Sequence, residues 1–253
     1  MAKVKRSSWN RYSARQAAQR EAAAAEMMAY SMDAAGKASV ATIAKNGTRI
    51  AIKHGRAAAA LACVWYDKMA AEAKVDVQKA DPVVVANSGR IAAQVNDATR
   101  YIDAGDVEAF AKECGDAVAG EVKRSVSRTM MKNARRDQAE FAWVPQGSET
   151  CAFCEALASN GWTPARRETA MGDHNEHIHP NCECEFAVRF NGEDTIAGYD
   201  EKVEELREKY RSAEGKSSKA KINSMRRDNY AKHQKEITAR QRENYAIRKD
   251  MEP

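Results

Sequence analysis

Apolar residues recur at helical spacing along most of the first 140 residues of the chain. Residues 11–32 hold almost no helix breaker and include an alanine run, so their helix propensity is high. Residues 56–80, 87–101 and 107–140 also place small or apolar residues in steps of three and four. In the second of these four segments the apolar positions are Leu61, Val64, Trp65 and Met69. The pattern predicts a mainly α-helical region built of long helices.

Several places in this region leave the path of the chain open. Residues 38–53 fit a helix broken near Gly47, or a short hairpin around that Asn-Gly pair, and we favour the helix. Gly55 is expected to interrupt helical sequence, and Gly115 is a candidate break in the last long helix. Residues 82–85 (Pro-Val-Val-Val) fit either an extended segment or a first helical turn.

The composition agrees with solvated helices around modest cores. Apolar residues make up 43% of the chain, charged residues 30% and aromatic residues only 7%, so fewer aromatic side chains are expected in the core than in a typical enzyme. No stretch approaches the ~18 uncharged apolar residues of a membrane span, and the basic N-terminus lacks the apolar region of a signal peptide. We therefore expect neither a membrane span nor export by the Sec pathway.

The character of the chain changes at residue 141. Residues 141–145 (Phe-Ala-Trp-Val-Pro) predict a short strand, and residues 150–190 then hold four of the six cysteines and three of the five histidines. Because so short a segment can bury only a small core, a compact module there needs a staple. We therefore divide the chain into a helical domain (1–140), a zinc-stapled Cys/His module of α+β type (141–192) and a charged, basic helical tail (193–253).

The cysteines and histidines of this module are spaced like metal ligands. The first two cysteines form a C-x-x-C pair, which lets two thiolates bind one ion from a tight turn. Thiolate and imidazole donors select zinc or iron–sulfur clusters over magnesium or calcium, and the abundance of histidine favours zinc. The candidate ligands are Cys151, Cys154, His179, Cys182 and Cys184. These are five candidates for four places, and His179 could replace one of the two distal cysteines.

A zinc ion held by three or four cysteines is normally saturated, which favours a structural staple over a catalytic centre. Glu176, Glu183 and Glu185 are available as general bases, so a zinc-dependent hydrolase or nuclease is the alternative. The motif order does not fit a nucleic-acid deaminase, and no histidine between His179 and His233 completes an HNH-type nuclease. Without a metal, the same residues would be reduced thiols in a small core beside surface histidines.

The basic charge is concentrated in two places. The net charge is only +5, from 41 basic and 36 acidic residues, but residues 216–249 hold eleven bases against three acids. Four more bases follow each other at four-residue spacing within residues 124–136, which places them along one side of a helix. Such surfaces fit nucleic-acid phosphates, an acidic partner protein or a plain solvated helix face. The candidate contact residues are Arg124, Arg128, Lys132, Arg136, Arg226, Arg227, Lys232 and Lys235.

The motifs in combination resemble a known family. Residues 143–162 (Trp-Val-Pro-Gln-Gly-Ser-Glu-Thr-Cys-Ala-Phe-Cys-Glu-Ala-Leu-Ala-Ser-Asn-Gly-Trp) and 179–184 (His-Pro-Asn-Cys-Glu-Cys) are similar to the Mu F-like head morphogenesis or minor capsid proteins of tailed bacteriophages. In those proteins a helical N-terminal region precedes a C-x-x-C pair and a closing H-P-x-C-x-C element. The basic segment 128–134 looks like the helix that leads into their motif. The resemblance covers residues 123–190, about a quarter of the chain.

This resemblance implies a low-copy virion protein that is assembled in the host cytoplasm and acts in head assembly or genome delivery. Its implied place is the capsid interior near the portal, with the portal protein and the major capsid protein as partners and packaged DNA as a further contact. Some relatives are described as capsid maturation proteases, so a protease joins the nuclease as the alternative function. The sequence itself offers no nucleophile, base and orienting group for that reaction.

Overall fold

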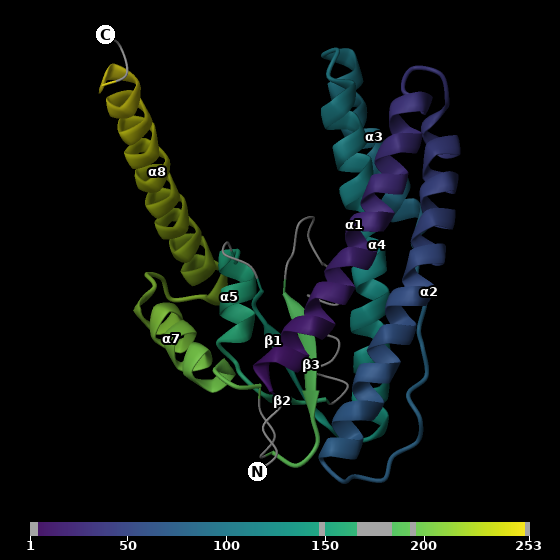
Figure 1. Cartoon of the computed structure of the whole chain (residues 1–253), viewed down its shortest axis with the longest axis vertical. Helices are drawn as coiled ribbons and strands as arrows, with labels where there is room; N and C mark the ends of the chain where they lie inside the picture. Colours follow the sequence, from purple (N-terminus) through teal and green to yellow (C-terminus); the bar gives the residue numbers. More distant parts are fainter. Residues whose placement is uncertain (1–4, 147–149, 166–183, 193–195, 251–253) are drawn as a thin grey trace.

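The computed structural model describes residues 5–146, 150–165, 184–192 and 196–250, with side chains up to residue 235 (Figure 1). These residues form a body of four long helices, a small sheet beside it, and a C-terminal helix that projects away from both (Figure 1). The four long helices are α1 (Arg6–Ala34), α2 (Val40–Glu72), α3 (Ser88–Asp103) and α4 (Val107–Arg136). The prediction of a mainly helical chain is confirmed.

Three of the long helices start at side chains that cap them. Ser39, Asn87 and Asp106 precede α2, α3 and α4, and each accepts a hydrogen bond from the backbone N–H three residues further on, at 3.2, 2.9 and 2.9 Å. These bonds satisfy N–H groups that have no partner inside the helix, so short polar residues fix where each helix begins.

Three glycines expected to interrupt helices lie inside continuous ones instead. Gly47 and Gly55 are interior to α2, and Gly115 is interior to α4. A Cβ at Gly115 would stand 2.8 Å from Met28 Cγ and 3.0 Å from the Ala24 carbonyl oxygen of α1, closer than packed atoms approach. The predicted breaks are therefore wrong, because these glycines serve close helix crossings rather than turns.

Helix α2 ends at Glu72, eight residues before the predicted end at residue 80, and an extended segment leads from it to α3. Four alternate residues of that segment donate their backbone N–H to four α4 side chains, at 2.9 to 3.1 Å. The pairs are Asp81 with Asn133, Val83 with Thr129, Val85 with Ser125, and Asn87 with Glu121. We call this set the α4 ladder; it settles residues 82–85 as extended backbone.

The ladder depends on a match between two repeats. Two residues of extended chain advance about 6.6 Å, and four residues of helix advance about 6 Å. The two elements run antiparallel, so alternate residues of the segment meet every fourth residue of α4. The carbonyls of residues 81, 83 and 85 also accept hydrogen bonds from Asn133, Thr129 and Ser125. Side chains of α4 therefore bond both the N–H and the C=O groups of alternate residues, as the backbone of a neighbouring strand does in a sheet.

The sheet has the order β2-β1-β3 and is antiparallel. Its strands are β1 (Glu140–Val144), β2 (Thr163–Pro164) and β3 (Glu185–Arg189), and the strand predicted over 141–145 is β1. Phe141 stacks on Phe186 with ring centroids 5.1 Å apart, and Trp143 meets Phe186 edge-on at 5.0 Å. These rings share one face of the β1/β3 pair, because Phe141 and Trp143 lie opposite Val188 and Phe186.

Three further described helices follow the first strand along the chain and pack against one another beside the sheet. They are α5 (Ala152–Ala158), α7 (Tyr199–Ser212) and α8 (Ser218–Asp250), and α5 contacts both α7 and α8. One cluster of buried side chains runs from Trp9 in α1 through the sheet to Leu206 in α7, so sheet and helical body share a core. No helix in the described ranges is long and apolar enough to cross a membrane.

Candidate metal centre

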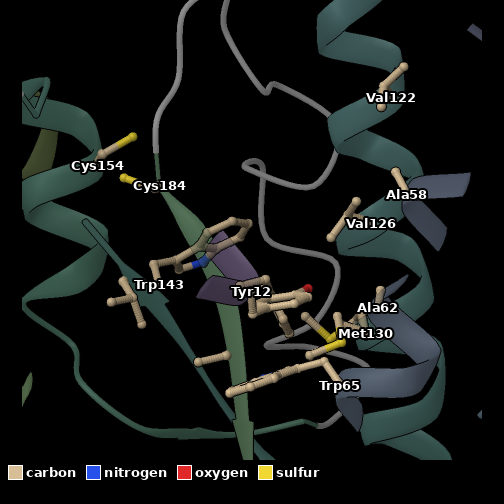
Figure 2. Close-up of a cluster of buried hydrophobic side chains, with 14 of the residues drawn as sticks. Tyr12, Ala58, Ala62, Trp65, Val122, Val126, Met130, Trp143, Cys154 and Cys184 are labelled. Atoms are coloured by element: carbon tan, nitrogen blue, oxygen red, sulfur yellow. The ribbon is translucent and has the colours of Figure 1, made fainter. Parts of the chain in front are cut away.

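Three of the five predicted metal ligands lie where α5 and β3 begin. Cys151 caps α5, and its Sγ accepts a hydrogen bond from the Cys154 backbone N–H at 3.4 Å. Cys154 lies in the first turn of α5 and Cys184 directly precedes β3; both are 2% exposed. In Figure 2 the Cys184 side chain points toward the helix that carries Cys154. The C-x-x-C pair thus occupies the start of a helix, where the spacing alone predicts a tight turn.

Strand pairing explains why cysteines 30 residues apart in sequence share one end of the sheet. Val144, the last residue of β1, pairs with Glu185, the first residue of β3. The chain that leaves β1 there leads into α5, and the chain that enters β3 there carries Cys184. The register between the two strands therefore places the first cysteine pair and Cys184 at the same end of the β1/β3 pair.

Each of two cysteines is followed by a glutamate that a distant residue anchors. Glu155 accepts hydrogen bonds from Lys209 of α7 at 2.7 and 2.8 Å and from Asn229 of α8 at 3.1 Å. Glu185, which is 1% exposed, pairs with Arg20 of α1. The backbone next to Cys154 and Cys184 is therefore fixed by contacts from three helices. Sequence reasoning missed these anchors because their partners lie far along the chain.

The complete ligand set cannot be assembled from the described residues. His179 and Cys182 lie outside them, and within the described ranges no three His, Cys, Asp or Glu side chains are grouped to hold a metal. The donor types that are described still fit the predicted ion, because buried thiols suit zinc and not magnesium or calcium. The zinc staple remains a prediction in which Cys151, Cys154 and Cys184 would supply thiolates.

Glu185 does not fit the alternative role of a general base. Its carboxylate is buried against the Arg20 guanidinium, so the oxygens that a base would use are occupied by a cation of the protein itself. Glu176 and Glu183, the other two candidate bases, lie outside the described residues. Nothing in the described part of the site therefore assembles a base beside the cysteines.

The basic stripe on α4 is not a continuous surface. Arg124 is 4% exposed and donates to Glu121 at 2.7 Å; burial lowers the pKa of Arg124, and the Glu121 carboxylate opposes that change. Arg136 donates to Asp137 and to the carbonyls of Gln78 and Lys79. Two of the four bases therefore hold the protein's own structure together. The stripe as a surface is reduced to Arg128 and Lys132, which are exposed.

The sequence signal that could have identified Arg124 as internal is Glu121, three residues earlier on the same helix. Glu121 is fully buried and accepts from Arg90 at 2.8 Å, as well as from Arg124 and from the backbone of Asn87. A buried carboxylate needs such partners, and here the partners come from two helices and the α4 ladder. Arg124 thus neutralises an internal acid.

The predicted contacts of the tail lie on exposed positions of α8, with Arg226 and Arg227 before Asn229, which bonds Glu155 of α5, and Lys232 and Lys235 beyond it. The first turns of α8 are packed, since Met225 is 1% exposed and clusters with Ala152 and Ala213. Beyond them the helix projects from the body (Figure 1), and Tyr230 is 66% exposed. The four predicted contact residues of α8 are all exposed: Arg226, Arg227, Lys232 and Lys235.

A comparison with protein families covers this arrangement except for α8. The model of a family described as VG15 protein matches residues 3–213, which include the four long helices, the sheet, α5 and α7. No curated protein and no solved structure matches the chain.

Proposed function

Because the chain belongs to the VG15 family, a family of phage proteins, we propose that it is a minor capsid or head morphogenesis protein. The proposed place is inside the head near the portal, with the portal and major capsid proteins as partners. The observation that carries this proposal is the extent of the family match, which takes in the helical body and both halves of the cysteine motif. The Mu F-like spacing of that motif supports the same role.

The described architecture favours a structural component over an enzyme. Glu185, beside Cys184, pairs with Arg20 of α1, and Glu155, beside Cys154, pairs with Lys209 of α7. These ion pairs hold α1 and α7 against the segments that carry the cysteines. A zinc ion at this point would supply a tetrahedral cross-link between the starts of α5 and β3. The chain's own residues would hold α5 and the sheet in register around that cross-link.

We propose that the exposed bases of α8 contact packaged DNA. Arg226, Arg227, Lys232 and Lys235 lie on a helix that leaves the body, so phosphates can approach it without displacing other elements. Contacts of this kind release counterions, which makes binding independent of sequence and sensitive to salt.

The virion role is tested by mass spectrometry of purified procapsids and mature virions from a phage that encodes this protein. The proposal expects the chain in both particles at low copy number, and an amber mutation in its gene should yield defective heads. Its absence from both particles, with normal heads from the amber mutant, would overturn the proposal.

The zinc staple is tested by metal analysis of the purified chain and of Cys151→Ser and Cys184→Ser variants. The wild type should hold one zinc, and both variants should lose zinc together with folded stability. Cys63→Ser is the matched control, since Cys63 lies in α2 away from the motif, and it should keep both. A zinc-free wild type overturns the staple; folded, zinc-free variants that lose a hydrolytic activity of the wild type would favour the hydrolase.

The DNA contact is tested by filter binding over a series of salt concentrations. Arg226→Glu/Arg227→Glu should weaken binding and flatten the dependence of log affinity on log salt by about two charge contacts. Arg49→Glu, an exposed charge reversal on α2, should leave both unchanged. Binding by the wild type that does not respond to salt contradicts phosphate contact.

A further inference from the structure

A groove lies between the N-terminal half of α1 and the C-terminal half of α2. Each helix contributes four residues at spacings of three and four, which is one helix face, and the hollow between them has a volume of about 190 Å³ and is open to solvent. Its lining residues are Ser8, Arg11, Tyr12 and Arg15 from α1, and Leu61, Val64, Trp65 and Lys68 from α2. We call this feature the α1/α2 groove. None of the predicted site residues lies in it.

The floor of the groove is aromatic and rigid. Tyr12 and Trp65 stack with centroids 4.8 Å apart and planes 13° from parallel, and Figure 2 shows the two rings together at the base of the core. Trp9 packs against both rings, at 5.6 and 5.8 Å. Tyr12 and Trp65 are each 6% exposed, so they close the bottom of the groove, and most of the apolar surface that a ligand could reach comes from Leu61 and Val64.

One wall of the groove is apolar and open to solvent. Val64 is 69% exposed, the highest value among the large apolar side chains that the structure describes as exposed. Leu61, one turn before it, is half-buried. An exposed apolar residue alone needs no explanation, but here it adjoins a hollow with an aromatic floor, which is the anatomy of a binding groove.

The rim of the groove is basic. Arg11 and Arg15 are exposed on the α1 side, and Lys68 is exposed on the α2 side with its Nζ 5.4 Å from the Trp65 ring centroid. None of the groove's described lining residues is acidic, and Lys68 Nζ lies 3.6 Å from the carboxylate of Glu72, one turn further along α2. An apolar trough between positive rims fits a ligand with an apolar ridge between negative flanks.

We propose that the α1/α2 groove is a docking site for an amphipathic helix of a partner protein, with an apolar ridge flanked by acidic residues. The matched faces of α1 and α2 are the geometry that helix-in-groove recognition uses. Charge complementarity selects the acidic flanks, because Arg11, Arg15 and Lys68 would repel a basic helix.

Two other occupants fit less well. Nucleic acid would need rings open for base stacking, and the rings of Tyr12 and Trp65 are almost completely buried. A second copy of this chain offers α8, which is basic, or α7, whose apolar residues Val203 and Leu206 are already buried within its own copy. Neither described helix of a second copy combines acidic flanks with a free apolar ridge.

The test uses a labelled helical peptide with leucines on one face and glutamates on both sides of that face, and fluorescence anisotropy with the full chain. A control peptide carries lysine at every glutamate position. The acidic peptide should bind and the lysine peptide should not. Val64→Glu and Arg11→Glu/Arg15→Glu should each weaken binding by about tenfold or more, the loss expected for one buried apolar side chain or two charge contacts.

Two protein controls locate the site. Arg49→Glu places a single charge reversal on α2 outside the groove, and Arg226→Glu/Arg227→Glu makes the same double charge reversal as Arg11→Glu/Arg15→Glu while removing basic surface of α8 that could attract the peptide without a groove. Both should bind the acidic peptide like the wild type. The proposal is overturned if the groove variants bind unchanged, if only the α8 variant loses binding, or if groove variants lose affinity for duplex DNA instead.

Discussion

Arg20 in the middle of α1 forms an ion pair with Glu185 at the start of β3, 165 residues further along the chain. The side chain of Arg20 is 14% exposed and that of Glu185 is 1% exposed, so the pair lies in the interior. It joins the first helix to the strand that follows Cys184. The helical body and the cysteine module are therefore held together by a charge pair as well as by their shared core.

Removal of Arg20 should destabilise the whole chain. Arg20→Ala leaves a buried carboxylate without its cation, and we expect the free energy of unfolding to fall by about 3 kcal/mol. Urea denaturation followed by circular dichroism measures the change. Arg20→Met/Glu185→Leu should recover most of the loss, because it removes both charges and keeps the volume.

The control for this prediction is the Lys53–Glu26 pair, which also involves α1 but whose side chains are 65% and 39% exposed. Lys53→Ala should cost less than about 1 kcal/mol, because solvent screens that pair. An Arg20→Ala variant that loses no more stability than Lys53→Ala would show that the Arg20–Glu185 pair contributes nothing beyond a surface contact.

Two glycines of α4 should respond in opposite directions to alanine. Gly115→Ala forces a Cβ against Met28 and the Ala24 carbonyl of α1, and should lower the free energy of unfolding by about 1–3 kcal/mol. Gly120→Ala meets only the end of the Arg124 side chain, at 3.5 Å, and should raise it by about 0.5–1 kcal/mol through helix propensity. Thermal unfolding of the two variants checks the sign; equal effects would refute the close crossing at Gly115.

The α4 ladder should be visible in amide exchange. Thr129 is fully buried, and its hydroxyl serves both the N–H and the C=O of Val83. Thr129→Val keeps the shape but removes those bonds, so the Val83 amide should exchange faster and the stability should fall by about 1–3 kcal/mol. Thr99→Val, which removes a hydroxyl bonded only to the Asn96 carbonyl nearby, should change the stability by less than about 0.5 kcal/mol. Unchanged exchange at Val83 would argue against the ladder.

The stability of the protein should decline in alkali, in part through Cys114. Burial raises the pKa of this thiol from 9.0 to about 11, since the thiolate would lie in a core with no exposed surface. The folded state therefore resists ionisation: this contribution is complete below pH 9 and is lost as the pH rises from 9 through 11. Urea midpoints across that range should fall less for Cys114→Ala than for the wild type. Parallel slopes would show that the thiol does not titrate differently in the two states.

Most of the helical architecture could be predicted from the sequence because local spacing carries it. The helix predicted over 87–101 lies within two residues of α3, and capping residues such as Asn87 mark the starts. The glycines at 47, 55 and 115 misled because a turn and a close helix crossing both require a missing side chain. Only the partner helix distinguishes the two, and it is not local information.

The candidate site could be predicted only in part, for a related reason. The spacing of Cys151 and Cys154 predicts a tight turn, and the structure places the pair in the first turn of α5. The function of Arg124 depends on a buried Glu121 and on Arg90 in another helix, so a stripe that looks like a surface in sequence is partly interior. The glutamates beside Cys154 and Cys184 find their cations in α7 and α1, which no spacing rule connects to them.

The α4 ladder also bears on how this chain can change during evolution. Connections between helices usually accept insertions and deletions, but each residue gained or lost between Asp81 and Asn87 would move every second N–H away from its partner on α4. A compensating change would have to shift four side chains along α4 at once. We therefore expect the length of this connection to be fixed among relatives, while the turn at Gly105, which has no such register, varies freely.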